Sequence, residues 1–244
     1  MISGTADPVA LAAARPTLDR LDAQAVELPD AEILQALFEM PQNARECVVP
    51  PGLHPTNPAA LVFMAWRCPT SPWGAFTLVQ ARAQVRSGTR PRGFVTAAWC
   101  DQADAATALA QGFGFPTRVG EVSLERHYDR VDLEVTSQGE CILRLEGVDP
   151  DPLAPGDVQY SATMNLATTP RGVRLLQVEP TFTLNRAERL RPRLARFEAA
   201  AFGDPVLDPY HPVSASIARG DIVIPPLRFV CRPGEMAFTG TEPV

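Results

Sequence analysis

The sequence has no lysine: each of its 22 basic residues is an arginine. This absence excludes one kind of catalysis, because an imine with a keto acid forms on a primary amine such as the side chain of lysine. Arginine stays protonated over the ordinary pH range, so it binds carboxylates and enolates well but is a poor general base. No side chain of this protein can therefore form a Schiff base.

Cysteine and histidine are also scarce. The five cysteines are far apart and include no C-x-x-C pair, and the three histidines have no metal-ligand spacing to one another or to a cysteine. This pattern predicts reduced thiols and no metal site. Because there is also no phosphate-binding glycine loop and no nucleophile motif, we expect no cofactor and identify no catalytic residue.

Positive charge and long apolar segments are lacking as well. The net charge is −6 and the pI is about 5.1, which argues against a nucleic-acid partner. The longest apolar run, AALVFMAW, is too short to span a bilayer, and no basic stretch leading into an apolar one begins the sequence. We therefore expect no membrane partner and a cytoplasmic location.

Proline is abundant, with 25 residues, and β patterns dominate the chain. Residues 1–28 predict an arm or a helix, and residues 29–244 a single domain. We expect strands at 59–68, 73–86 and 93–100, two or three strands in 120–148, a hairpin in 159–184 and a final strand at 222–231. Segment 31–40 fits a strand or a helix, and 101–112 fits a helix capped by Asp101. Many strands and few helices predict a mainly β, antiparallel barrel closed on itself, with a few short helices.

The strand predicted at 73–86 alternates in polarity. Phe76, Leu78, Gln80, Arg82 and Gln84 fall on one face, while small or apolar residues fall on the other. The helix predicted at 101–112 leads into the turn QGFGFPTRVG, whose glycines and proline restrict the backbone next to position 117. Such a turn can hold one side chain firmly at the mouth of a cavity.

Five segments occur in an order that resembles the acetoacetate decarboxylase family from about residue 30 to residue 230. They are VVPPGLHP, FMAWRCPTSPWGAF, GFVTAAWCDQADAATALAQGFGFPTRVG, TMNLATTPRGVRLL and DPVLDPYHPVSASIARGDIVIPP. The resemblance implies a barrel or cone of the acetoacetate decarboxylase-like type around a central cavity, and a possible homo-oligomer.

The resemblance also implies a lysine pair after the aromatic-proline turn, of which the first forms the imine and the second lowers its pKa. Here those positions match Thr117 and Arg118. The family motif that precedes the turn matches residues 109–111, a family glutamate matches Leu78, and a family arginine falls near Ala31. The catalytic set of the family is therefore missing, and we expect no decarboxylation through an imine.

The cavity that the resemblance implies has eight candidate lining residues if the strand face of Leu78 points inward. They are Thr117, Arg118, Gln80, Leu78, Phe76, Thr96, Trp99 and Phe115. Trp73 is a further candidate, although Trp73, Trp99 and Phe115 could instead simply fill the core. Arg118 would bind a small anion if it faces the cavity; the alternative is that it points to solvent or pairs with Glu121.

Two functions remain open at this point. One is a binding protein for a small organic acid or similar metabolite, which kept the cavity of the family and lost its reaction. The other is a lyase, hydratase or cyclase that acts without covalent catalysis on a small keto or hydroxy acid. An acid or base facing the cavity, such as Glu39, Glu121 or His127, would favour the enzyme.

Overall fold

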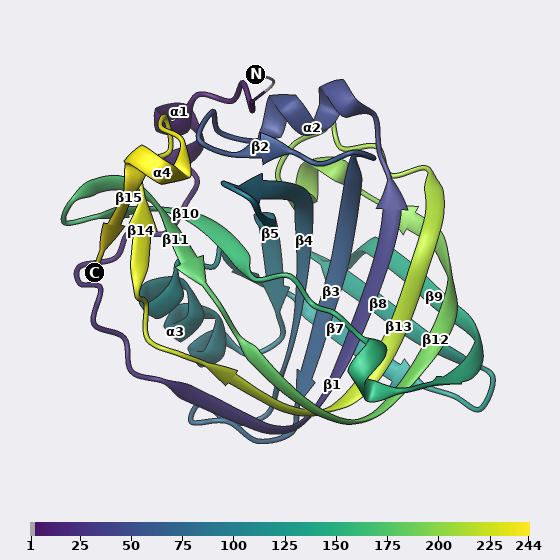
Figure 1. Cartoon of the computed structure of the whole chain (residues 1–244). Coiled ribbons are helices and arrows are strands. Elements are labelled where there is room, and N and C mark those ends of the chain that lie inside the picture. Colours follow the sequence, from purple (N-terminus) through teal and green to yellow (C-terminus); the bar gives the residue numbers. More distant parts are fainter. Residues whose placement is uncertain (1–2) are drawn as a thin grey trace.

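The computed structural model describes residues 3–244, which form one extended, strongly curled β-sheet with short helices around it (Figure 1). The first half contains α1 (Pro8–Ala12), β1 (Val26–Glu39), α2 (Gln42–Val48), β2 (His54–Pro55), β3 (Ala60–Cys68), β4 (Phe76–Ser87), β5 (Arg90–Cys100) and α3 (Ala103–Phe113). Next come β6 (Thr117–Val119), β7 (Glu121–Arg126), β8 (Arg130–Ser137), β9 (Glu140–Leu153) and the 3-10 turn η1 (Pro155–Asp157). The last part contains β10 (Thr163–Thr169), β11 (Gly172–Val178), β12 (Thr181–Phe197), η2 (Ala199–Phe202), β13 (His211–Ile224), β14 (Phe229–Cys231), α4 (Ala237–Gly240) and β15 (Thr241–Pro243).

The prediction of a mainly β fold with few helices is confirmed, but the closed antiparallel barrel is wrong. The strand order runs from β15 and β14 through β11, β10, β5, β4, β3, β1, β13, β12, β9 and β8 to β7, and the two end strands do not pair. The sheet is also mixed, because β5 pairs in parallel with both β6 and β10. A parallel pair needs a crossover connection, and α3 supplies it between β5 and β6.

One open alternative is resolved, and two local predictions need correction. The ambiguous segment 31–40 belongs to a strand, β1, which starts at Val26. The helix α3 is capped by the Gln102 side chain, while the Asp101 side chain instead accepts a hydrogen bond from the backbone of Thr77. The predicted final strand is broken into β13 and β14 because two consecutive prolines, which have no N–H to donate, follow Ile224.

The central strands are buried on both faces, and their alternate residues enter two hydrophobic cores. The first, which we call the β core, includes Phe63, Val79, Phe94 and Leu133. The second, which we call the α3 core, includes Trp66, Leu78, Leu109, Phe113 and Phe115. Polar side chains on the α3 side of β4 are therefore buried deep in the protein.

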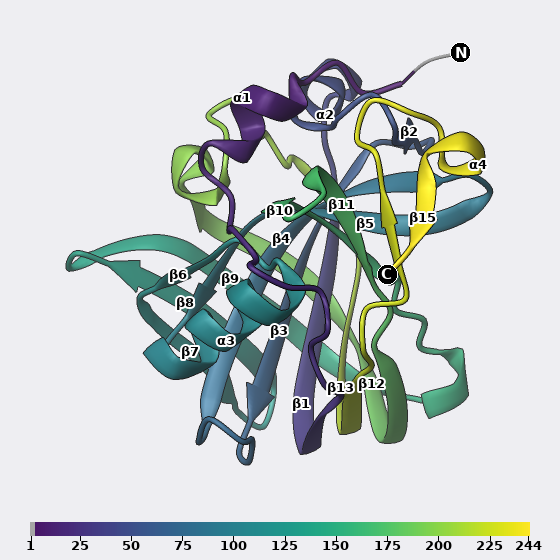
Figure 2. The same ribbon diagram turned by 90° about the vertical axis from the view of Figure 1, so that its left-hand side faces the viewer.

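The N-terminal segment covers α3 before it enters the sheet (Figure 2). The backbone N–H of Leu18 donates to the carbonyl of Thr168 in β10, and residues 17–24 share a pocket wall with the last turns of α3. The segment expected to be an arm or a helix therefore packs, with its short helix α1, against the face of the molecule that carries the turn at 114–118. No helix within residues 3–244 has the length and apolar character needed to cross a membrane.

Candidate functional site

Strand β4 places two polar side chains, Gln80 and Arg82, inside the protein. Both follow Leu78 on the face that enters the α3 core, and their exposed fractions are 0% and 1%. The Arg82 Nε and Nη2 atoms donate to the Gln80 Oε1 atom at 3.0 and 2.8 Å, and Nη1 donates to the carbonyl of Ser161 at 3.3 Å. The guanidinium carbon also lies 5.9 Å from the ring centroid of Trp66. The guanidinium is thus fixed in position by neutral groups.

A glycine in the neighbouring strand makes room for this arginine. A Cβ atom on Gly93 of β5 would lie 3.0 Å from the Arg82 Cδ atom and 3.1 Å from its Cβ atom. Atoms of two side chains do not approach this closely unless one of them moves. Any larger residue at position 93 would therefore displace the arginine. The sequence therefore provides both the buried charge and the space for its stem.

The charge of Arg82 has no counter-ion among the described residues. Its three hydrogen bonds go to an amide and a backbone carbonyl, and no carboxylate contributes to its titration. Burial lowers the pKa of Arg82 to about 9. A buried cation that only neutral groups compensate costs several kcal/mol, so an anion that reaches it gains a strong interaction.

Polar atoms without partners gather around this arginine. Buried atoms that make no hydrogen bond to the described residues include Trp66 Nε1, Gln80 Nε2, Thr163 Oγ1 and Asn165 Oδ1. The buried Tyr160 hydroxyl lies near them with the Ser216 side chain as its neighbour. Each unsatisfied buried group costs about 1–3 kcal/mol, so these groups call for a partner, such as water or a ligand. We call these five residues together with Arg82 the Arg82 cluster.

Strand pairing and ring contacts bring the cluster together. Trp66 is on β3, where its cross-strand partner is Leu78, the neighbour of Gln80 on the same face of β4. Thr163 on β10 pairs with Gly93, over which Arg82 passes. Asn165 lies two residues further along β10 and donates through Nδ2 to the carbonyl of Phe113, at 2.9 Å. The cluster is therefore built by three different strands of one sheet.

Aromatic side chains form the apolar part of this site. Trp66 lies edge-on to Phe115 and to Phe182, with 6.2 Å between ring centroids in each pair, and Phe182 contacts Tyr160 at 4.7 Å. Tyr160 and Phe182 also line a surface pocket of about 350 Å³ next to η1. Burial raises the pKa of Tyr160, so its hydroxyl keeps its proton and can donate.

The eight residues predicted from the sequence divide into separate groups. Gln80 belongs to the Arg82 cluster, and Phe115 contacts its Trp66. Leu78 is packed in the α3 core. Phe76 is at the edge of that core and lines a pocket at the end of the strands. Because β-strand side chains alternate, Trp99 and Arg118 lie on the opposite side of β5 from Gln80.

The turn after α3 therefore does not direct its two matched residues into the cluster. The Thr117 hydroxyl donates to the carbonyls of Ala106 and Phe115, at 2.8 and 3.1 Å. The Arg118 side chain lies over the ring of Trp99 and donates to the carbonyl of Ala201 at 3.3 Å. Thr96, Thr117 and Arg118 do come together, with Arg15, around a separate pocket of about 440 Å³.

Sequence reasoning missed most of the Arg82 cluster. It placed Arg82 on the correct face of β4 but omitted it from the site, and it did not include Trp66, Tyr160, Thr163 or Asn165. The signal that could have found Arg82 was its position on the same face as two apolar residues in a strand that is buried on both sides. Thr163 and Asn165 alternate with apolar residues of β10 in the same way.

The acid–base residues considered from the sequence lie elsewhere. Glu39 is at the end of β1, where Tyr210 donates to it at 3.4 Å. Glu121 is exposed on β7, and His127 lies between β7 and β8 beside Asp132. Within the described part of the chain, no group of three or more histidine, cysteine or acidic side chains is arranged to hold a metal ion.

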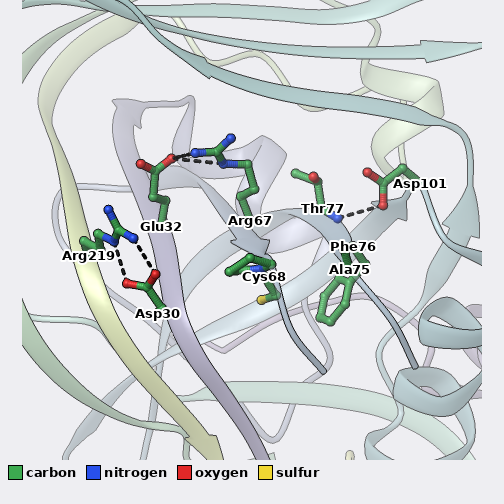
Figure 3. Close-up of a pocket in the computed structure, with 10 residues that line it drawn as sticks. Asp30, Glu32, Arg67, Cys68, Ala75, Phe76, Thr77, Asp101 and Arg219 are labelled. Atoms are coloured by element: carbon green, nitrogen blue, oxygen red, sulfur yellow. Dashed lines mark hydrogen bonds and ion pairs between the residues drawn. The ribbon is translucent and has the colours of Figure 1, made fainter. Parts of the chain in front are cut away.

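A second arginine-containing pocket, of about 400 Å³, lies at the far end of the central strands (Figure 3). Its charges are paired: Arg67 donates to Glu32 at 3.0 and 2.6 Å, and Arg219 pairs with Asp30. Asp101 accepts from the Thr77 backbone at 2.7 Å. This pocket is polar and accessible, but its arginines already have carboxylate partners.

Comparison with known proteins places the fold. Acetoacetate decarboxylase from Legionella pneumophila superposes with a TM-score of 0.75 at 18% identity, covering 84% of this chain and 86% of that one. The enduracididine biosynthesis enzyme MppR complexed with pyruvate superposes with a TM-score of 0.67 at 18% identity, covering 84% of this chain and 89% of that one. An acetoacetate decarboxylase-like enzyme from Sphingomonas wittichii RW1 superposes with a TM-score of 0.66 at 14% identity, covering 84% of this chain and 92% of that one.

The sequence comparison agrees with the structural one. A search of curated proteins finds no match to the chain. The sequence profile of the acetoacetate decarboxylase family, however, matches residues 13–185, which include α3, the turn at 114–118 and all six residues of the Arg82 cluster. The chain therefore belongs to the acetoacetate decarboxylase family.

Proposed function

We propose that this protein binds a small organic acid at the Arg82 cluster, with the carboxylate of the acid paired to the Arg82 guanidinium, and that it does so without forming an imine. The observation that carries the proposal is a guanidinium buried among neutral groups, with unpartnered polar atoms around it. A carboxylate would supply the missing negative charge and accept charge-assisted hydrogen bonds, each contributing about 1.5–3 kcal/mol.

The rest of the ligand should be compact and mostly uncharged. The wall beside Arg82 consists of Trp66, Phe115, Phe182 and Tyr160, which favours a small apolar or carbonyl-containing group. Donors without partners, such as Trp66 Nε1 and Gln80 Nε2, suit a keto or hydroxy oxygen. The structure of the relative MppR with pyruvate, a small keto acid, supports this class of ligand.

Two features support binding rather than covalent chemistry. The position matched to the imine-forming lysine is Thr117, whose hydroxyl is engaged by two backbone carbonyls. The Arg82 cluster consists of arginine, amide, hydroxyl and indole groups, which bind and orient an acid but do not readily exchange protons with it near neutral pH. The proposal therefore favours a binding protein over a hydratase or cyclase.

The test measures which acids bind and through which arginine. The native protein is screened by thermal shift against pyruvate, acetoacetate, lactate and phenylpyruvate, and the best ligand is titrated by calorimetry. Arg82→Met should weaken its binding by about a hundredfold or more, because two charge-assisted hydrogen bonds are lost. Arg219→Met, which removes an arginine already paired with Asp30, should change the affinity less than about twofold.

Two outcomes would contradict the proposal: no acid in the panel binds the native protein, or the best one binds the Arg82→Met variant equally well. Near-UV circular dichroism shows whether each variant keeps its native packing. Should Arg82→Met lose it, the double variant Gln80→Leu/Arg82→Met replaces the whole polar pair and provides the same comparison in an apolar environment.

The absence of imine chemistry has its own test. The protein is incubated with acetoacetate and borohydride, and intact mass spectrometry is used to detect a reduced adduct. Because the sequence contains no lysine, we expect no adduct on an internal residue. A stoichiometric internal adduct would refute this part of the proposal even if the acid binds at Arg82.

A further inference from the structure

A separate pocket, of about 440 Å³, lies beside β5, and Arg82 is not among the residues that line it. Its walls come from α1 and the segment that follows it, from β5, from the end of α3 with its turn, and from Gly203 after η2. Two arginines, Arg15 and Arg118, stand in these walls, while the other lining residues are mainly alanine, leucine and proline. The pocket therefore combines a strongly positive side with an apolar one.

Arg15 is fixed in its place by β5. Its Nη1 atom donates to the carbonyls of Val95 and Thr96 at 3.0 and 2.7 Å, and its guanidinium carbon lies 5.5 Å from the ring centroid of Phe94. Only Nη1 is engaged in hydrogen bonds to the described residues, so Nε and Nη2 remain as donors. The side chain is thus held while part of its donor set is still free.

Arg118 is fixed in a similar way from the opposite wall. Its guanidinium carbon lies 5.7 Å from the ring centroid of Trp99, and Nη1 donates to the Ala201 carbonyl. The pairing with Glu121 that the sequence allowed as an alternative is not formed; Arg118 donates to the Ala201 carbonyl instead. Burial, and to a smaller extent the nearby charge of Arg118, lowers the pKa of Arg15 to about 10.

We propose that Arg15 and Arg118 form a second anion-binding site, distinct from the Arg82 cluster, that takes the phosphate group of a small phosphate monoester. Two guanidinium groups that repel each other and have no carboxylate partner among residues 3–244 are best neutralised by an anion with a charge near −2. The pocket is also larger than phosphate needs, and its apolar wall at Ala10, Leu11 and Ala14 can accept the organic part of a monoester.

The two sites have no lining residue in common. Phe94 and Trp99, against which Arg15 and Arg118 lie, belong to the β core, whereas Trp66 beside Arg82 belongs to the α3 core. Each site can therefore be tested through its own arginines. This separation allows each proposal to fail without the other.

The experiment measures the binding of inorganic phosphate and of glycerol 3-phosphate to the native protein by calorimetry near pH 7.5, at constant ionic strength. Arg118→Gln and Arg15→Gln should each weaken both ligands by about tenfold or more, because each removes charge-assisted hydrogen bonds. Arg219→Met, which removes a half-exposed arginine already paired with Asp30, should stay within about twofold of the native affinity. Arg15→Lys keeps the charge and should retain more affinity than Arg15→Gln.

The proposal is overturned if phosphate does not bind the native protein saturably, or if Arg118→Gln leaves the affinity unchanged. Arg118 is exposed, so its replacement should not disturb folding and this comparison stays decisive even if Arg15→Gln unfolds. Glycerol 3-phosphate should bind at least as tightly as inorganic phosphate; markedly weaker binding would overturn the assignment to a phosphate monoester.

Discussion

The interior site and the pocket in Figure 3 use arginine in opposite ways. In the interior, Arg82 is fully buried and is held by an amide and a backbone carbonyl. In the pocket, Arg67 and Arg219 are about half exposed and each faces a carboxylate, Glu32 or Asp30. The charges of Arg67 and Arg219 are already neutralised and hydrated. The buried charge of Arg82 has no carboxylate partner among the described residues, so it would interact strongly with a bound anion.

This difference separates a charge that shapes a surface from a charge that serves a ligand. Exposed ion pairs contribute about 0–1 kcal/mol to stability, and salt screens them. A buried unpaired guanidinium destabilises the free protein, so its presence is best explained by a bound state in which it is compensated. The more accessible pocket is therefore the weaker candidate for the binding of an acid.

The largest expected effect is on stability. The double variant Gln80→Leu/Arg82→Met replaces a buried polar pair by apolar side chains of similar size, and the free energy of unfolding should rise by about 1–3 kcal/mol while binding of the acid is lost. Urea unfolding measures this change. A lower free energy of unfolding in a variant that still folds would mean that Gln80 and Arg82 stabilise the fold. The buried arginine would then have a structural role, as the exposed arginine pairs do.

The second effect concerns pH. Arg82 must be protonated to hold a carboxylate, and burial lowers its pKa to about 9. The protonated fraction of the free protein therefore falls above that pH, and the affinity for the acid should drop about tenfold between about pH 8 and about pH 10. Calorimetric titration over this range gives the profile. A flat profile would show that Arg82 keeps its proton in the free protein, or that another group holds the carboxylate.

Much of the fold could be predicted because its strands carry clear local patterns. The hairpin of β10 and β11, the run from β7 to β9 and the alternation in β4 all followed from period-two polarity and turn residues. Closure could not be predicted in this way, because it depends on which distant strands pair. The parallel pairing of β5 with β10 joins residues about 70 positions apart and has no local signature.

The site was harder to predict because it depends on which face of each strand is turned inward. The turn at 114–118 suggested that Thr117 and Arg118 face the same cavity as Gln80, yet both line a different pocket together with Arg15, and only the tertiary contacts reveal this. Arg82 was on the right face, but nothing in the sequence shows that Asp and Glu side chains lie far from it. Trp66, Tyr160 and Asn165 join it only through tertiary packing.

The smallest effect is expected at the surface pocket and provides the reference for the others. Arg219→Met breaks the pair with Asp30, in which both side chains are about half exposed. The free energy of unfolding should fall by less than about 1 kcal/mol, and the difference between native and variant protein should shrink in high salt as screening weakens the pair. Urea unfolding at low and high ionic strength measures both quantities. A loss of several kcal/mol that persists in high salt would show that this pair behaves as a buried one, and the distinction between the two regions would then rest on ligand binding alone.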